Sequence, residues 1–209
     1  MELDIIIPSF KNIVDCMEQI EQIKKTRRTS GRLIFTGLKD SASVNRNWGL
    51  EMASKFGFAS GLVLSIDDDV RNFFDGFDLK LAEDFIANES VAFMISARLL
   101  NKDESFQNVN GDNKNYSGNL VRSLRDVCPS ACIIFRSEPD IRFFTGYLGS
   151  SWEDSDICMQ YKKKYPHKGV FFSNGCKLIH LNEAKNQIPY VDHNQAIFFQ
   201  RWQNQRRRR

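Results

Sequence analysis

A regular alternation of short apolar segments with segments of helical periodicity runs through the first 70 residues of the chain. Three apolar, β-branched-rich segments occupy residues 3–7, 33–35 and 62–66. Between them, residues 13–25 and 44–56 place large apolar side chains at three- and four-residue steps, as in amphipathic helices. Consecutive strand–helix–strand units pair their strands in parallel through right-handed crossovers. We therefore expect an α/β fold with a mostly parallel central sheet flanked by helices.

The rest of the chain continues this alternation less regularly. Its patterns predict helices at 79–87, 153–164 and 196–202, strands at 91–97, 131–135, 170–172 and 177–181, and an aromatic segment at 143–147. Residues 101–119 are rich in Asn, Asp, Gly and Ser, and they predict a long flexible loop of the kind that is usually functional. Neither a repeat nor a linker is evident, which favours a single domain over residues 1–209.

The net charge of +3 comes from one end of the chain. Arg206–Arg209 alone carry +4, so the remainder is close to neutral, and the total charge does not indicate a nucleic-acid or membrane partner. The five cysteines are scattered and form no Cys-x-x-Cys pair, which favours free thiols in a reducing compartment. No apolar run approaches the roughly 18–20 residues that span a bilayer. We expect a cytoplasmic protein without a transmembrane segment.

Three consecutive aspartates, Asp67, Asp68 and Asp69, directly follow the apolar segment 62–66. Adjacent carboxylates repel one another and cannot all enter a core, so we expect them at the carboxyl end of the strand, where open α/β sheets bind ligands. In an extended backbone Asp67 and Asp69 point to the same side, where they could hold Mg²⁺ or Mn²⁺ bridged to phosphates. A solvated acidic turn or a helix N-cap is the alternative.

A second acidic cluster, Glu153-Asp154-Ser155-Asp156, follows Trp152 at the predicted start of a helix. Acidic residues in a first helical turn also stabilise the helix dipole, and that structural role is the alternative to a functional one. A third candidate is His180, near the end of the predicted strand 177–181. By itself, a histidine among apolar residues is more often a core residue than a metal ligand.

Taken in chain order, these motifs resemble glycosyltransferase family two, the inverting enzymes of the GT-A fold. The resemblance rests on five elements, which are Ile5–Asn12, Ser41–Gly49, Ile66–Asp69, Glu153–Asp156 and His180. It covers about residues 3–181, and the order of the five elements is more specific than any one of them. One departure concerns the end of the second strand, where many relatives carry an acidic run that reads the nucleotide base and this chain has Phe35–Asp40.

The resemblance implies metal-dependent transfer of a sugar from a nucleoside-diphosphate sugar, with a UDP-sugar favoured, to a hydroxyl group of a glycan, small molecule or modified base. It implies Mn²⁺ or Mg²⁺ held by Asp69 and His180, with Asp67 as a further ligand. Asp154 would act as the general base, and Glu153 would orient a substrate. The ion would act as a Lewis acid on the phosphates.

The same resemblance assigns binding roles to other residues. Those expected at the nucleotide sugar are Pro8, Ser9, Asn12, Arg46, Asp67 and Asp68, with Thr36 or Asp40 in place of the base-reading acid. Tyr147 and Trp152 would stack on a sugar of the acceptor. Residues 1–100 would form the nucleotide-sugar-binding half and residues 120–202 the acceptor and catalytic half, followed by a basic tail at 203–209.

Other functions are open at this stage. The tail Arg206–Arg209 suits a DNA-modifying glycosyltransferase that acts on a hydroxylated base, because arginines follow a phosphate backbone. It equally suits a lipid-linked or cell-surface glycan precursor at an anionic membrane. A nucleotidyltransferase and a non-catalytic GT-A-like binding module are further alternatives, although a binding module needs none of the acidic motifs. The donor sugar, the acceptor and the oligomeric state are left open.

Overall fold

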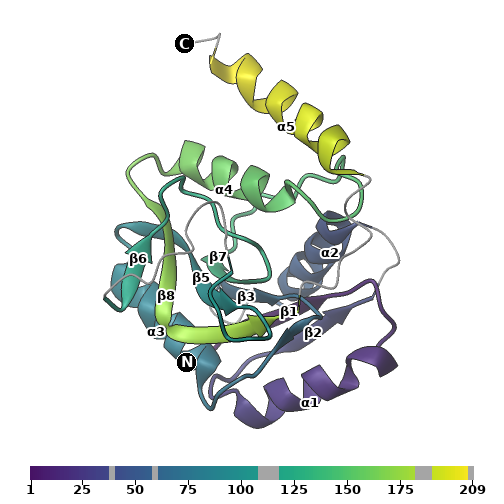
Figure 1. The fold of residues 1–209 in the computed structure, drawn as a ribbon, viewed down its shortest axis with the longest axis vertical. Coiled ribbons are helices and arrows are strands. Elements are labelled where there is room, and N and C mark those ends of the chain that lie inside the picture. Colours follow the sequence, from purple (N-terminus) through teal and green to yellow (C-terminus); the bar gives the residue numbers. More distant parts are fainter. Residues whose placement is uncertain (38–40, 58–60, 108–117, 182–189, 207–209) are drawn as a thin grey trace.

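The computed structural model describes residues 1–37, 41–57, 61–107, 118–181 and 190–206, and side chains as far as Trp202. The chain forms an α/β structure in which helices flank a mixed eight-stranded sheet (Figure 1). Its strands are β1 (Asp4–Pro8), β2 (Leu33–Thr36), β3 (Leu62–Ile66), β4 (Val70–Arg71), β5 (Ala92–Leu100), β6 (Leu120–Arg122), β7 (Cys132–Arg136) and β8 (Gly169–His180). The helices are a 3-10 turn (Val14–Cys16), α1 (Met17–Thr26), α2 (Ala42–Lys55), α3 (Phe77–Asn88), α4 (Glu153–Lys164) and α5 (Val191–Arg206).

The strand pairing is mixed, so the expectation of a mostly parallel sheet is corrected. The strand order is β2-β1-β3-β7-β5-β8-β4, and β6 also pairs with β8. The β1–β2, β1–β3 and β5–β8 pairs are parallel, whereas every pairing made by β4, β6 and β7 is antiparallel. Parallel neighbours need a crossover connection, usually a helix, and within the described residues no helix joins β5 to β7. The strand β7 runs antiparallel to both its neighbours, β3 and β5.

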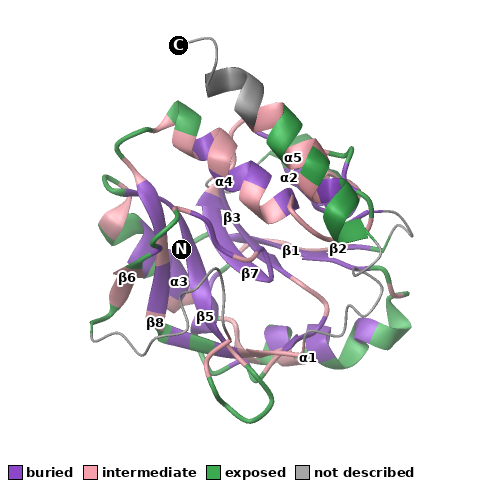
Figure 2. Cartoon of the chain, turned by 45° about the horizontal axis from the view of Figure 1, so that its top comes forward, coloured by how far each residue is buried: buried purple, intermediate pink, exposed green. Residues whose placement is uncertain are grey.

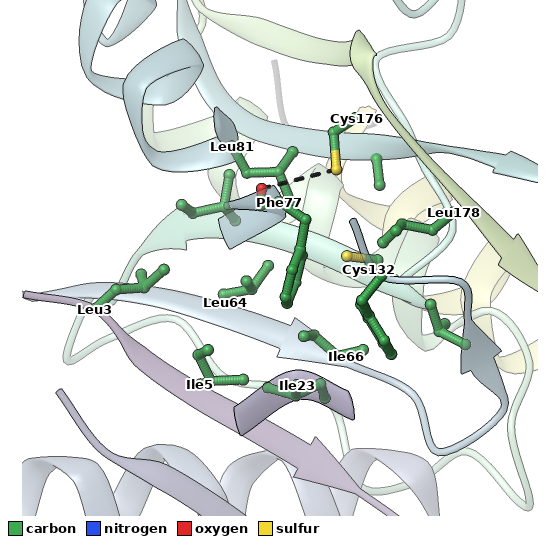
Figure 3. Close-up of a cluster of buried hydrophobic side chains, with 14 of the residues drawn as sticks. Leu3, Ile5, Ile23, Leu64, Ile66, Phe77, Leu81, Cys132, Cys176 and Leu178 are labelled. Carbon is green, nitrogen blue, oxygen red and sulfur yellow. Dashed lines mark hydrogen bonds between the residues drawn. The ribbon is translucent and has the colours of Figure 1, made fainter. Parts of the chain in front are cut away.

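Side chains of the central strands alternate between two buried clusters, one on each face of the sheet. Ile5, Ile7 and Leu64 pack with Ile23 of α1 and Phe77 of α3 (Figure 3). On the other face, the cluster includes Ile6 and Val63 of the sheet, Leu50 of α2, and Ile157 and Tyr161 of α4. Both faces of the central strands are buried, as Figure 2 shows. These strands are therefore apolar on both sides, which is why they read as continuous apolar runs in the sequence.

Close packing of α2 brings its first turns to the end of β1. Gly49 faces Ile6, and a Cβ atom on Gly49 would lie 2.3 Å from Cγ2 of Ile6. The absence of a side chain therefore lets the helix approach the strand. At the start of the helix, the Ser41 side chain accepts a hydrogen bond from the amide of Val44 and caps α2.

Several local predictions differ from the structure. The expected strands at 170–172 and 177–181 are one strand, β8, whose pairing with β5 shifts register at the polar stretch between them. The short strands β4 and β6 were not predicted, and residues 143–147 form neither helix nor strand. The helix expected at 196–202 is α5, which begins at Val191 and is the outermost helix in Figure 1. Part of the expected loop, residues 108–117, lies outside the described residues, as does Asp40.

The remaining helix predictions are close to the structure, and α4 has the predicted bounds. Acidic residues occupy its first turn and Lys162, Lys163 and Lys164 its last, an arrangement that suits the helix dipole at both ends. Within the described part of the chain, none of the helices has both the length and the apolar character needed to cross a membrane.

Candidate metal and acid–base site

A cavity of about 1050 Å³ lies at the carboxyl ends of β1 and β3. It is walled by the end of β1 with the loop that follows it, by the aspartate turn after β3, and by the first turns of α2 and α4. The segment before β7, at residues 125–131, and Tyr190 and Phe198 of the C-terminal segment also line it. The predicted residues that line the cavity are Pro8, Ser9, Arg46, Asp67, Asp68, Asp69, Trp152, Glu153, Asp154 and His180. The fold thus brings residues separated by up to 172 positions into one cavity.

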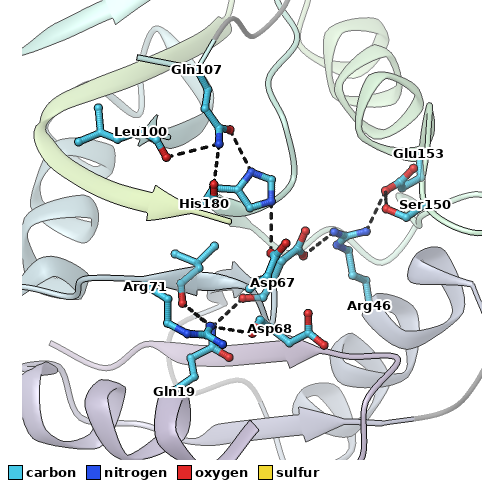
Figure 4. A network of polar contacts seen from close by, with 12 residues as sticks. Gln19, Arg46, Asp67, Asp68, Arg71, Leu100, Gln107, Ser150, Glu153 and His180 are labelled. Atoms are coloured by element: carbon cyan, nitrogen blue, oxygen red, sulfur yellow. Dashed lines mark hydrogen bonds and ion pairs between the residues drawn. The ribbon is translucent and has the colours of Figure 1, made fainter. Parts of the chain in front are cut away.

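Asp67, Asp69 and His180 form one cluster in this cavity. Figure 4 shows Asp67 and His180 of this cluster close together. After the aspartate turn the chain enters β4, in which Val70 pairs with His180 of β8. This short antiparallel pairing places the imidazole Nε2 3.2 Å from Oδ1 of Asp69. One ligand atom from each of the three side chains lies within 4.8 Å of the other two. A divalent cation could therefore contact all three.

The main chain of the aspartate turn is held by a glutamine that was not predicted as a site residue. Gln19 of α1 is fully buried, and its Nε2 donates to the carbonyl oxygens of Asp67 at 2.7 Å and Val70 at 3.1 Å. Arg71 also donates to the carbonyl of Asp68. The signal for Gln19 was present in the sequence, since it lies on the apolar face of the predicted helix 13–25.

The second aspartate of the triplet points elsewhere. Asp68 accepts a hydrogen bond from the hydroxyl of Ser9, which lies at the end of β1. Burial raises the pKa of Asp68, and the hydrogen bond from Ser9 partly offsets that effect. Asp68 and Ser9 therefore form a pair on the β1 side of the cavity, apart from the metal-ligand cluster.

Arg46 of α2 connects the aspartate turn to the start of α4. Its guanidinium donates to Asp67 at 2.6 Å and to Glu153 at 3.1 Å, and the side chain is only 2% exposed. Arg46 was predicted to approach the nucleotide, but its terminal nitrogens bind the protein's own carboxylates. Arg46 also lines the cavity, so its approach to a nucleotide stays a prediction; in the structure its guanidinium organises two acidic groups.

Glu153 and Asp154 occupy the first turn of α4, directly after Trp152, whose φ of 68° is left-handed. Glu153 Oε1 accepts from Arg46 and from Ser150, whereas its buried Oε2 has no hydrogen-bond partner. A buried acceptor without a partner is energetically costly. Asp154 accepts a hydrogen bond from the amide of Ser155 at 2.6 Å and faces the cavity.

Four carboxyl groups of the cavity, those of Asp67, Asp68, Glu153 and Asp154, have raised pKa values. Burial raises the pKa of Asp67 to about 6, an effect reduced by Arg46 and reinforced by Asp69. Burial likewise raises the pKa values of Glu153 and Asp154, although Arg46 opposes the shift in both. Burial alone would lower the pKa of His180, but the hydrogen bond with Asp69 and its charge raise it overall. Groups with such shifts are typical of functional sites.

Tyr147 does not lie in the cavity, so its predicted stacking role is corrected. Its side chain is 1% exposed, and its hydroxyl donates to Asp156 at 2.8 Å. Asp156 also accepts from Arg201 at 2.8 Å and from Trp202 at 3.1 Å, so it anchors α5 to α4. The last acidic residue of the Glu153–Asp156 motif therefore has a structural role, because the protein's own donors take its oxygens.

Two of the predicted nucleotide-binding residues also lie away from the cavity lining. Thr36 is buried, and its hydroxyl donates to the carbonyl of Asn45 at 2.9 Å. Asn12 is exposed and accepts from the amide of Asp15 at the start of the 3-10 turn. Both have local structural partners. Asp40, the other candidate at this position, lies outside the described residues.

The C-terminal helix contributes to the site in a way that the sequence patterns did not indicate. Asn194 of α5 is fully buried, accepts from the amide of Leu148 at 3.0 Å and donates to its carbonyl at 2.8 Å. The ring of Phe198 packs 4.9 Å from that of Trp152. The helix therefore holds the segment that leads into Glu153 and Asp154, and gives the cavity an aromatic wall.

The residues of the cluster suit a divalent cation. Two carboxylates and an imidazole combine the oxygen ligands preferred by Mg²⁺ and Mn²⁺ with a nitrogen ligand that transition metals accept. A cation would also offset the carboxylates whose pKa values burial has raised. The metal ligands expected from the sequence, Asp67, Asp69 and His180, are therefore brought together by the fold.

Comparison of the whole chain with models of known protein families gives no match, and neither does comparison with curated protein sequences. The geometry of the site therefore carries the functional argument.

Proposed function

We propose that this protein is a metal-dependent inverting glycosyltransferase with a GT-A fold. The observation that supports this most directly is the contact of one guanidinium with both acidic clusters, at Asp67 and at Glu153. The metal-ligand cluster and the acid–base pair Glu153 and Asp154 are therefore neighbours in one cavity. Transfer from a nucleoside-diphosphate sugar needs these two functions side by side, one at the leaving diphosphate and one at the attacking hydroxyl.

On this proposal, Asp67, Asp69 and His180 hold Mn²⁺ or Mg²⁺, which supplies charge stabilisation at the diphosphate oxygens. Ser9, Pro8 and Asp68, on the β1 side of the cavity, face the nucleotide, for which a UDP-sugar is the favoured donor. Residues 1–100 thus provide the donor side, and residues 120–202 the acceptor side.

Asp154 acts as the general base. Its carboxylate takes the proton of the acceptor hydroxyl while that oxygen forms a bond to the anomeric carbon. The bond from the anomeric carbon to the diphosphate breaks on the opposite face, and the nucleoside diphosphate leaves with the bonding electrons, so the configuration inverts. Glu153, whose Oε2 has no hydrogen-bond partner within the protein, accepts a hydrogen bond from a hydroxyl group of the sugar or acceptor and orients that group. Burial, which raises the pKa of Asp154, also makes this carboxylate a stronger base.

The acceptor side of the cavity has an aromatic wall formed by Trp152, Tyr190 and Phe198. Aromatic faces pack against the apolar face of a sugar ring or against another apolar group. This wall replaces the pair Tyr147 and Trp152 expected from the sequence, because Tyr147 is buried.

The test is transfer from a panel of UDP-, GDP-, dTDP- and CDP-sugars with Mn²⁺ present, comparing the chain with Asp154→Asn. The variant should lose transfer and still bind the donor. Asp192→Asn serves as the control, because Asp192 is likewise in the first turn of a helix but is exposed. If no donor binds or turns over, the proposed function is wrong. If Asp154→Asn abolishes donor binding, the assignment of the base is wrong.

A further inference from the structure

Gln107 belongs to none of the motifs noted in the sequence. It lies in the 101–119 segment and is the last described residue before 108–117. Its side chain meets His180 at two points (Figure 4). The amide Nε2 donates to the carbonyl oxygen of His180 at 2.7 Å, and the amide Oε1 lies 3.0 Å from the imidazole Nδ1. The backbone of Gln107 is held in turn by a hydrogen bond to the carbonyl of Leu99 at 3.0 Å.

The donor and acceptor roles in this contact follow from its partners. A carbonyl oxygen can only accept, so the Gln107 amide must direct its NH₂ group toward the carbonyl of His180. The carbonyl of Leu100, 3.4 Å from the same nitrogen, favours the same orientation. The oxygen Oε1 then faces Nδ1 and can only accept from it. The imidazole therefore carries a hydrogen on Nδ1.

This hydrogen decides what the other ring nitrogen can do. With Nδ1 engaged by Gln107, Nε2 is the ring nitrogen that faces the cluster, 3.2 Å from Asp69. Without a cation Nε2 donates its hydrogen to Asp69, and once that hydrogen is lost Nε2 presents a lone pair to the cluster. In the other tautomer Nε2 would carry the hydrogen and could not bind a cation. Histidine ligands in proteins are generally held in this way, by an acceptor at the second nitrogen.

We propose that Gln107 is a positioning residue of the metal site, which fixes the tautomer and the ring orientation of His180. The inference rests on the metal ligands of the proposed function, Asp67, Asp69 and His180, and adds a supporting residue from the 101–119 segment. Loss of such a partner typically lowers metal affinity about 10–100-fold. The same range is expected for Gln107→Met, which keeps the length of the side chain and removes both polar atoms.

The experiment has two readouts on the whole chain. Binding of Mn²⁺ alone is titrated by the electron paramagnetic resonance of the free ion. The tautomer is measured at one fixed concentration of Mg²⁺, which is diamagnetic, from the ¹⁵N shifts of the histidine rings at a pH where unligated rings are neutral. The chain has three histidines, so variants His167→Gln and His193→Gln assign the signals of His180. Gln200→Met, on the exposed side of α5, is the control substitution.

The expected result is an Nδ1–H tautomer in the wild type and in Gln200→Met. In Gln107→Met, tautomer populations shift toward Nε2–H and Mn²⁺ affinity falls about 10–100-fold. An Nε2–H tautomer in the wild type, or unchanged Mn²⁺ affinity in Gln107→Met, would overturn the inference. A chain that shows the expected tautomers and Mn²⁺ binding but transfers no sugar would refute the proposed function and leave the role of Gln107 intact. A wild type that binds no Mn²⁺ would refute both.

Discussion

The guanidinium of Arg46 lies 2.6 Å from a carboxylate oxygen of Asp67, a residue 21 positions away on a different element. The same guanidinium reaches Glu153 at 3.1 Å, so one buried cation lies between two acidic groups. Each carboxylate would otherwise face the low-dielectric interior and its acidic neighbours alone. Arg46 is therefore the residue on which the arrangement of the cavity depends most.

Replacing Arg46 with Met should destabilise the protein by about 3–5 kcal/mol, because it leaves buried carboxylates without their counter-charge. Arg46→Lys should cost less, since an ammonium keeps the charge, but it cannot contact both carboxylates with the planar geometry of a guanidinium. Urea denaturation of the two variants measures the difference. Equal stability of Arg46→Met and wild type would contradict the bridging role.

Asp154→Asn should raise the stability of the protein at neutral pH while it removes transfer. Burial raises the pKa of Asp154, so the folded state binds this proton more tightly than the unfolded chain does. Ionisation of Asp154 consequently destabilises the fold, and that cost disappears as the pH falls through the raised pKa. Transfer should fall over the same pH range, because the base must be ionised. Thermal melts and a pH–rate profile test both effects.

Asp156→Asn is the matched control for this prediction. It is the same substitution two positions along the same helix, yet it should destabilise the protein, by about 1–3 kcal/mol. Oδ2 of Asp156 accepts from Tyr147, Arg201 and Trp202, and Oδ1 accepts from Gln160 at 2.7 Å. An asparagine would replace one of these acceptor oxygens with an NH₂ donor and would remove the charge that pairs with Arg201. If both variants change the melting temperature in the same direction, the separate roles of the two aspartates are refuted.

Mn²⁺ should stabilise the protein against heat, by about 2.7 kcal/mol when its concentration is 100 times the dissociation constant. Asp69→Asn should lose most of this effect, since Asp69 is a member of the metal-ligand cluster. Asp68→Asn should retain it, because Asp68 is bound to Ser9. Thermal melts with and without MnCl₂ separate the two neighbours, and the opposite ranking would show that the ligands are misassigned.

Asn194→Ala should loosen the segment that leads into α4. The Asn194 side chain is buried and hydrogen-bonds both the amide and the carbonyl of Leu148. Its replacement removes two hydrogen bonds, each worth about 0.5–1.5 kcal/mol, and so costs about 1–3 kcal/mol. Hydrogen exchange at residues 148–152 should become faster while β1 and β3 stay protected. Uniform protection of 148–152 in the variant would show that α5 does not hold this segment.

Local sequence patterns were sufficient for the elements that fold by their own periodicity. The helix α4 has its predicted bounds because acidic and basic residues mark its two ends. The strands β1 and β3 were evident as apolar runs, since both their faces are buried. The positions of the acidic motifs at the ends of these elements followed directly, whereas the roles expected of Asp67, Asp69 and Asp154 rested on the resemblance of the motif order to glycosyltransferases.

Other features depend on contacts between distant parts of the chain. The pairing of Val70 with His180, which brings the imidazole to Asp69, joins a two-residue strand to β8, and two residues have no periodicity to detect. Gln107 lies in an irregular segment, where no periodic pattern marks it. Tyr147 was predicted to stack on a sugar, but its side chain is buried and its hydroxyl binds Asp156, which also binds Trp202 of α5. The order of residues establishes which groups can carry charge and where helices and strands begin. The packing of helices on the sheet decides which of those charges face one another, because burial and distance set their pKa values and partners.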